Sequence, residues 1–273
     1  MLRTLASSAL LLALALFSLP AHADELGVLV SQLKPAVVHL EMRSADGKAS
    51  ATGFLLSPDG MIATNNHVIR DEEQITAIFE DGSRHEVLGW LARDESLDLA
   101  IVKIAGGPYP VLRLGSAAKL AQGTPVAILG GPLGFSFSFS EGIVSAVRPD
   151  GLPAEMKKDA EWAPPSSLLQ VTADVAHGSS GSPVVTADGT VVGVAQSMMP
   201  EGNVNFAVFA ERVEEMRAGI HAGAPVHPFS DESVLRNLLI SALLVGGAAG
   251  LFNLSMRRKA RRQQAARQRA FRA

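Results

Sequence analysis

The chain has 273 residues, of which 47% are hydrophobic and 19% are charged, and it contains no cysteine. That length suits one large all-β domain or two ordinary domains, and the missing cysteines exclude disulfides, cysteine-ligated zinc and thiol chemistry. All 27 acidic residues lie between Asp24 and Glu232, where only 14 of the 24 basic residues lie. This middle part therefore carries a formal charge of 14 − 27 = −13, which disfavours nucleic acid as a partner because it would repel phosphates.

Residues 1–23 are predicted to be a secretory signal peptide. Arg3 supplies the positive charge at its start, residues 10–19 form an apolar core, and Ala21-His22-Ala23 is a small-x-small cleavage site. The mature chain would then begin at Asp24. The alternative is an uncleaved N-terminal membrane anchor, which is disfavoured because the apolar stretch is short for a span.

The C-terminal part is predicted to be a membrane anchor. Residues 238–254 are 17 consecutive residues without a formal charge, and residues 256–273 carry eight Lys or Arg residues and no acid. Seventeen residues is close to the shortest transmembrane helix, and a buried helix of a soluble protein is the alternative. The adjoining cations favour the membrane, because the positive-inside rule places such a tail in the cytoplasm. We therefore expect a linker at 221–233, a transmembrane helix at 234–255 and a basic tail that meets anionic lipid headgroups.

Between these ends, residues 24–220 form a predicted all-β domain. Short apolar runs alternate with turn residues, as in Ser57-Pro58-Asp59-Gly60, and helical periodicity is almost absent. This pattern is typical of a β-barrel or a β-sandwich. Helices are expected at 24–34 and 211–220, and a long surface loop is expected at 149–167. The predicted strands are 36–42, 53–57, 61–64, 74–79, 84–91, 99–104, 125–129, 142–147, 168–172, 184–186, 190–195 and 203–209.

Ser180 is a candidate nucleophile, because it lies between glycines in the segment Gly178-Ser179-Ser180-Gly181. A serine hydroxyl needs a positioned base and a turn that exposes its oxygen beside main-chain N–H groups. Glycine permits such a turn and a close approach of substrate. The alternative is an ordinary Gly/Ser loop between strands. The choice between these two interpretations depends on whether the rest of the chain supplies a base and an orienting acid.

A base for Ser180 should be a histidine, and His67 is the best placed of the seven. It follows the predicted strand 61–64, whereas the others lie in the signal peptide, in a strand, near a turn, in the linker or in the serine loop. Asp98, at the start of a predicted buried strand, is the candidate for the carboxylate that orients the imidazole. Asp94 and Glu95 are rivals in a polar turn, where they are explained more simply as solvated charges.

The order His67, Asp98, Ser180 on an all-β chain resembles that of the chymotrypsin-like serine proteases. The local sequences are similar to the bacterial Deg (high-temperature-requirement) branch, which has Thr-Asn-Asn-His-Val, Asp-Leu-Ala and Gly-Asn-Ser-Gly-Gly-Pro segments. Here these correspond to residues 64–68, 98–100 and 178–183. The resemblance covers about residues 37–209, and it implies two six-stranded β-barrels with the active site between them.

The resemblance also implies further site residues. It places an oxyanion hole at the main-chain N–H groups of Gly178 and Ser180, and substrate contacts on the strand that contains Val204 and Phe206. Ser179 and Ser182 replace the family's Asn and Gly, and because both are small, the hole is expected to persist. The PDZ domain that many relatives carry after the protease is not expected, since the linker and the predicted span follow instead.

Asp174 is a candidate for cleavage specificity. It lies six residues before Ser180, where trypsin-like enzymes place the residue at the base of the primary pocket. A carboxylate there would favour Arg or Lys at the cleaved bond. The alternative is a surface acid, because the Deg branch generally has a small or apolar residue there and cleaves after aliphatic residues.

The sequence thus predicts a single-pass serine endopeptidase of the inner membrane, with its protease domain in the periplasm and its tail in the cytoplasm. Protein or peptide substrates are expected, in envelope protein quality control or processing, without a metal or other cofactor, and the chain could form a homo-oligomer. One alternative is a non-catalytic binding or scaffold protein on a protease fold. Another is a cytoplasmic globular protein whose two ends are core helices.

Overall fold

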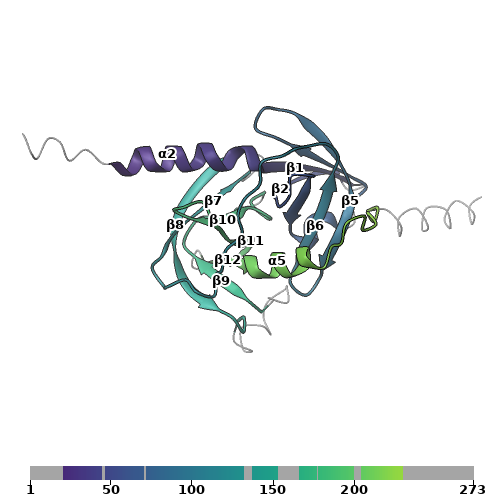
Figure 1. The fold of residues 1–273 in the computed structure, drawn as a ribbon. Helices are drawn as coiled ribbons and strands as arrows, with labels where there is room; N and C mark the ends of the chain where they lie inside the picture. The colour runs from purple at the N-terminus through teal and green to yellow at the C-terminus, as the bar shows by residue number, and fades with distance from the viewer. Residues whose placement is uncertain are drawn as a thin grey trace, which may run out of the picture. The chain divides into compact units, whose positions relative to one another are not determined.

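The computed structural model describes residues 21–44, 47–70, 72–131, 137–152, 166–176, 178–199 and 204–229, which build two closed β-barrels (Figure 1). All neighbouring strands pair antiparallel. In barrel 1 the strands are neighbours in the order β1-β2-β3-β6-β5-β4, and in barrel 2 in the order β10-β11-β12-β9-β8-β7. The prediction of an all-β fold with two six-stranded barrels is therefore confirmed.

The strands of the two barrels follow one another along the chain. Barrel 1 contains β1 (Val37–Ser44), β2 (Gly47–Leu55), β3 (Met61–Thr64), β4 (Gln74–Ile78), β5 (Arg84–Asp94) and β6 (Leu99–Ile104). Barrel 2 contains β7 (Pro125–Gly130), β8 (Ser138–Arg148), β9 (Leu168–Val171), β10 (Pro183–Thr186), β11 (Val191–Met199) and β12 (Val204–Phe209).

Alternating burial explains why these segments are strands. In β1 the side chains of Val38, Leu40 and Met42 are buried, whereas those of His39 and Glu41 are only half-buried. Successive side chains of a strand point to opposite faces, so one face of β1 fills the barrel. Burying a large apolar side chain such as these contributes roughly 1.5–3 kcal/mol.

Several strands are longer than the hydrophobic pattern predicts. β2 begins at Gly47 rather than at residue 53, and β8 begins at Ser138 rather than at residue 142. The added residues pair through their main chains, as in the pairs Ser44↔Gly47 and Gly130↔Ser138. Because ladder hydrogen bonds do not depend on side-chain polarity, a hydrophobic pattern cannot detect such extensions.

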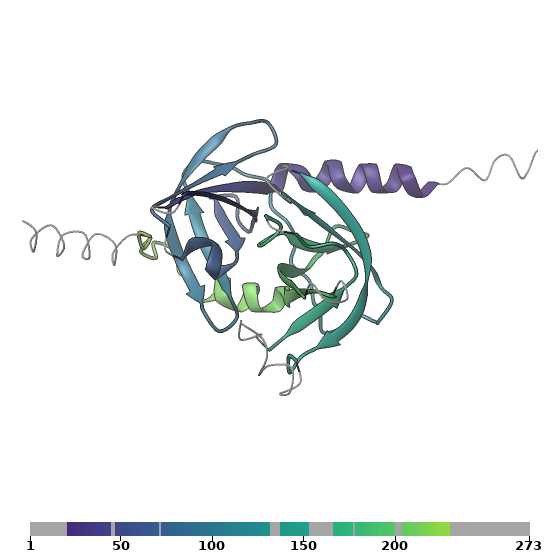
Figure 2. The same ribbon diagram turned by 180° about the vertical axis from the view of Figure 1, so that it is seen from behind.

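Two helices connect the barrels. Helix α2 (Ala21–Leu33) continues through the 3₁₀-helix η1 (Lys34–Ala36) into β1 of barrel 1. Its buried Leu29 and Leu33 lie near Gly189, in the turn between β10 and β11 of barrel 2. At the other end, helix α5 (Ala210–Ala218) packs against β5 and β6 and also against β11 and β12 (Figures 1 and 2). Both helices therefore contribute to holding the barrels together.

Residues 221–229, the described part of the predicted linker, form a strap along β5. The main chains of Trp90 and His227 exchange two hydrogen bonds of 2.8 Å. Their rings stack with centroids 4.2 Å apart and an angle of 19° between the planes. The Arg93 guanidinium lies 5.0 Å from the centroid of the Trp90 ring, within the range of a cation–π contact. This part of the chain is thus bound to barrel 1 rather than forming a free tether.

The connection between the barrels is also anchored. Arg113, which precedes β7, forms an ion pair of 2.7 Å with Asp188 in the turn between β10 and β11. Hydrogen bonds from the Thr186 and Thr190 hydroxyls lower the pKa of Asp188 to about 2. Asp188 therefore stays ionised at neutral pH and keeps the turn and the connection joined.

Some predicted segments lie outside the described residues. These are residues 1–20 of the predicted signal peptide, residues 153–165 of the predicted surface loop, the predicted transmembrane helix 234–255 and the basic tail 256–273. Helix α2 begins at Ala21, within the predicted cleavage motif. Of the helices in the described ranges, none has the length and apolar character needed to cross a membrane.

Candidate active site

His67 and Asp98 come from neighbouring elements of barrel 1. His67 lies in α3 (Asn66–Ile69), a single helical turn that follows β3, and Asp98 directly precedes β6. Strands β3 and β6 pair, with Thr64 opposite Ala100, so the end of one strand meets the start of the other. The sheet register thus brings together two residues that are 31 positions apart in the sequence.

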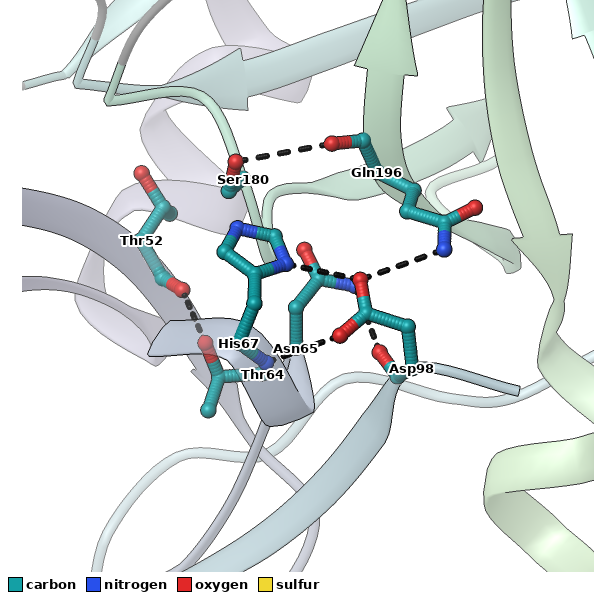
Figure 3. A network of polar contacts seen from close by, with 7 residues as sticks. All are labelled: Thr52, Thr64, Asn65, His67, Asp98, Ser180 and Gln196. Atoms are coloured by element: carbon teal, nitrogen blue, oxygen red, sulfur yellow. Dashed lines mark hydrogen bonds and ion pairs between the residues drawn. The ribbon is translucent and has the colours of Figure 1, made fainter. Parts of the chain in front are cut away.

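The Asp98 carboxylate is the centre of a hydrogen-bond network (Figure 3). Its Oδ2 accepts hydrogen bonds from His67 Nδ1 at 2.7 Å and from Gln196 Nε2 at 3.1 Å, and its Oδ1 accepts one from the His67 main-chain N–H at 2.8 Å. The Asp98 main-chain oxygen accepts from Asn65 Nδ2 at 3.0 Å and from the Asn66 N–H at 3.1 Å. With Nδ1 donating, neutral His67 has Nε2 as its free acceptor, which is the form a general base needs.

Ser180 comes from barrel 2, in the loop between β9 and β10. Figure 3 shows the His67 ring between Asp98 and Ser180, with its second nitrogen on the side of Ser180. The Ser180 hydroxyl donates to the Gln196 main-chain carbonyl at 3.5 Å. Catalytic hydrogen bonds are often long or poorly aligned in substrate-free enzymes and tighten only in the substrate complex.

The loop around Ser180 is fixed by its main-chain carbonyls. The Gly178 oxygen accepts from Thr52 Oγ1 at 2.9 Å, and the Ser180 oxygen accepts from the Thr52 N–H at 2.9 Å. The Ser179 oxygen accepts from the Ser182 N–H at 2.9 Å. Within the described part of the chain, no hydrogen bond engages the N–H of Gly178 or Ser180. Among these residues, therefore, no acceptor occupies either donor.

Both serines that flank Ser180 in the motif fit the loop. Ser182 is fully buried, and its Oγ lies only 1.9 Å from the point where a Cβ would stand at residue 130. Gly130 therefore makes the room that the Ser182 hydroxyl needs. Ser179 is 3% exposed, and its Oγ accepts from the Ala176 N–H at 3.3 Å, which tightens the turn before Ser180.

A comparison with protein families assigns the chain. Residues 51–194, more than half of its length, match the family described as trypsin-like peptidase domain. The chain belongs to this family. The match includes His67, Asp98 and Ser180 and spans strands of both barrels.

Individual relatives are proteases. Human serine protease HTRA4 is 33% identical over 204 residues, which are 72% of this chain and 41% of that protein. Serine protease HTRA1 of Xenopus laevis is 31% identical over 201 residues, which are 70% and 42% of the two chains. This peptidase chain thus spans less than half the length of these relatives.

Solved structures show the same fold. The Rv3671c protease from M. tuberculosis in its active form has a TM-score of 0.64 and 27% identity, over 76% of this chain and 90% of that one. The HtrA-type protease AlgW with a tripeptide has a TM-score of 0.63 and 25% identity, over 75% and 65% of the two chains.

Of the residues predicted to bind substrate, Asp174 and Val204 lie at one edge of barrel 2 in this trypsin-like domain. Asn205 pairs with Val171, so Val204 and Asp174 lie near the same end of the β9–β12 ladder. Asp174 is exposed, and its N–H donates to Ser140 Oγ at 2.8 Å. Val204 is half-buried, whereas Phe206 is only 1% exposed and belongs to the core. In this structure, the edge thus presents Asp174 and Val204 to the solvent.

Two residues of the site were missed by the sequence reasoning. Gln196 sits at a register shift between β11 and β12, and this bulge directs its side chain to Asp98. Thr52 contacts the Ser180 loop from barrel 1. For Gln196, the only available signal was a glutamine at the end of an apolar run. For Thr52, nothing in the sequence indicates the contact. Elsewhere in the described ranges, no cluster of three or more His, Asp or Glu side chains could hold a metal.

The close packing of the Ser180 loop on barrel 1 can be tested at Gly181. Its φ is +83°, and a Cβ there would stand 2.1 Å from the Thr52 oxygen and 2.4 Å from Thr64 Oγ1. Gly223 has a φ of +81° with no atom within 4 Å of the corresponding point, so Gly223→Ala is a matched control for backbone strain alone. We expect a loss of about 1–2 kcal/mol in the free energy of unfolding for Gly223→Ala. For Gly181→Ala we expect about 1–3 kcal/mol more, measured by denaturant unfolding. Equal losses in both variants would show that the loop is not held against Thr52.

Proposed function

We propose that this chain is a serine endopeptidase in which Ser180 is the nucleophile, His67 the general base and Asp98 the orienting carboxylate. The observation that carries the proposal is the hydrogen bond of 2.7 Å between His67 Nδ1 and Asp98 Oδ2, with Ser180 on the other side of the same ring (Figure 3). A base oriented by a third group beside a serine is the arrangement that activates a hydroxyl. Membership of the trypsin-like peptidase family supports the same activity.

Each residue has one role in the proposed reaction. His67 Nε2 takes the Ser180 proton while Oγ attacks the carbonyl carbon of the scissile bond, and Asp98 stabilises the imidazolium that forms. The carbonyl oxygen becomes negatively charged and accepts hydrogen bonds from the N–H groups of Gly178 and Ser180. His67 then gives the proton to the leaving amine, which breaks the C–N bond. A water molecule, activated by the same histidine, releases the acyl group from Ser180.

Gln196 assists as a positioning residue. It is 7% exposed, and its amide donates to the carboxylate oxygen that also binds the imidazole. A hydrogen bond to a charged group is stronger in a buried place. The amide thus helps to hold Asp98 Oδ2 in line with His67 Nδ1, from the opposite barrel.

The triad is tested with Ser180→Ala and His67→Ala in the full-length protein. Nucleophile and base act as one unit, so each variant should reduce hydrolysis of an unfolded protein by about four to six orders of magnitude. An active-serine phosphonate probe should label the wild type and fail to label Ser180→Ala. Near wild-type hydrolysis by purified Ser180→Ala would refute the assignment. An unlabelled, inactive but folded wild type would favour a non-catalytic binding protein.

We further propose that substrates are proteins or peptides that lie along the edge of barrel 2, with Asp174 and the strand of Val204 and Phe206 in contact with them. The solved relative AlgW carries a tripeptide, which supports a peptide substrate. Asp174 is exposed in the substrate-free chain, so a basic side chain of a substrate can approach it.

Cleavage-site profiling of an unfolded protein tests the role of Asp174. If its carboxylate selects the residue before the cleaved bond, the wild type should prefer Arg or Lys there, and Asp174→Ala should lose that preference. The loss should be about twofold to fivefold in relative kcat/KM, because an ion pair with an exposed carboxylate contributes at most about 1 kcal/mol. Identical profiles, with aliphatic residues preferred in both, would remove Asp174 from the specificity determinants.

The remaining proposal concerns location: residues 234–255 cross the inner membrane once, the protease domain faces the periplasm in envelope protein quality control or processing, and the tail stays in the cytoplasm. The support is the charge-free run 238–254, followed by eight cations that resist translocation. Each cation near anionic lipid adds about 1 kcal/mol to the retention of the tail at that surface.

Protease protection of a C-terminal epitope tag tests this topology. In intact spheroplasts treated with an added protease, the tag should survive, and it should be lost only after the membrane is opened with detergent. The protease domain, probed by an antibody in the same samples, should be accessible in both. Loss of the tag from intact spheroplasts would mean that the tail lies outside and that the orientation is reversed.

A further inference from the structure

Thr52 crosses from barrel 1 to the Ser180 loop of barrel 2 with both its main chain and its side chain. It lies in β2, it is 1% exposed, and Figure 3 shows it beside Ser180 and Thr64. Its N–H donates to the Ser180 oxygen at 2.9 Å, and its Oγ1 donates to the Gly178 oxygen at 2.9 Å. Its own carbonyl accepts from Thr64 Oγ1 at 2.8 Å, which ties it to β3.

The Thr52 hydroxyl is a link in a chain of hydrogen bonds. It accepts from the N–H of Gly131, the residue after β7, at 3.0 Å and donates to Gly178. A hydroxyl has one donor and can accept at the same time, so both bonds use one oxygen atom. The chain joins three segments: the end of β7, strand β2 and the loop before Ser180.

These bonds determine how the peptide groups of the loop are turned. The peptide between Gly178 and Ser179 is held at both ends, because its carbonyl binds Thr52 Oγ1 and its N–H binds the Ala176 oxygen at 2.9 Å. The peptide after Ser180 is also held at both ends, by the Thr52 N–H and by the Ala195 oxygen, each at 2.9 Å. The Ser180 N–H belongs to the peptide between these two and is therefore restrained on both sides, whereas the Gly178 N–H precedes the first of them and is restrained on one side.

We propose that the Thr52 hydroxyl is the positioning residue of the oxyanion hole. It touches neither substrate nor the reacting atoms, and it acts by holding the Gly178 carbonyl so that the donors on either side of Ser179 face a common point. The proposal rests on the proposed function, since an oxyanion hole matters only if Ser180 attacks a carbonyl. Donors that are aligned before the reaction need no reorganisation as charge develops on the oxygen.

The test compares three variants of the full-length protein. Thr52→Val keeps the shape and removes the hydroxyl, and Thr52→Ser keeps the hydroxyl. Thr186→Val makes the same change in β10, where the hydroxyl binds Asp188 in a turn. The measurements are kcat and KM on a peptide amide, and the Ki values of two inhibitors, a peptide aldehyde and the product peptide. The aldehyde adds the Ser180 O–H across its carbonyl and places an oxyanion-like oxygen in the hole. The product peptide binds without a covalent bond and places no such oxygen there.

For Thr52→Val we expect kcat to fall at least about tenfold with KM within about twofold, because only the charged transition state uses the aligned donors. The aldehyde Ki should rise by a similar factor, while the Ki of the product peptide stays constant. Thr52→Ser should restore both values to within about threefold of the wild type. Thr186→Val should change neither, although its unfolding midpoint should fall.

Several outcomes would overturn the proposal. An unchanged aldehyde Ki in Thr52→Val, or an equal rise in the Ki of the product peptide, would show that the hydroxyl acts on binding or folding in general. If Thr52→Val does not fold, Thr52→Cys replaces it, because a thiol is only a weak hydrogen-bond donor. A kcat of Thr52→Cys equal to that of Thr52→Ser would then refute the proposal. A wild type that neither hydrolyses the amide nor binds the aldehyde would instead refute the proposed peptidase function.

Discussion

The candidate nucleophile and its candidate base are carried by different barrels, so the site exists only while the two barrels keep their alignment. Two side chains cross the interface in opposite directions. Thr52 of barrel 1 holds the Ser180 loop, and Gln196 of barrel 2 donates to Asp98. Both are more than nine-tenths buried, where a hydrogen bond is strong and an unpaired polar group is costly. A displacement of about 1 Å between the barrels would weaken both contacts and change the position of Ser180 relative to His67.

The second constraint is the backbone at Asp98. Its φ of +53° lies in the left-handed region, which a residue other than glycine adopts at a cost of about 1–2 kcal/mol. Asn65 and Asn66 offset that cost by donating to its main-chain oxygen. The two asparagines before His67 thus hold the acid in place, and the adjacent N–H of His67 binds the acid's carboxylate. A strained backbone conformation of this kind persists only where several independent contacts hold it, as they do at Asp98.

A feature of this structure could be predicted from the sequence when it depends on neighbouring residues of the chain. The barrels could be predicted because each strand is a short apolar run between turn residues, and His67, Asp98 and Ser180 were found because each adjoins such a run. The structure brings the first two into contact and places the third beside them, while their catalytic roles stay predictions. Gln196 and Thr52 could not be found, because their importance arises from contacts across the interface, which have no period in the sequence. The longer β2 and β8 were missed for a related reason, since polar residues extend a ladder through their main chains.

The position of α5 and the strap has a consequence for the order in which the protein acquires its structure. Residues 210–229 cover β5 and β6, strands whose last residue is Ile104, so barrel 1 receives part of its packing from a segment made more than 100 residues later. Barrel 1 therefore cannot reach its final packing before residues 210–229 have been made, and loop closure over such a distance is slow. Because Gln196 and the Ser180 loop also come late, a growing chain carries the histidine and the acid long before the serine. Under the proposed mechanism, which needs all three residues, a growing chain cannot form the triad until the loop between β9 and β10 has been made.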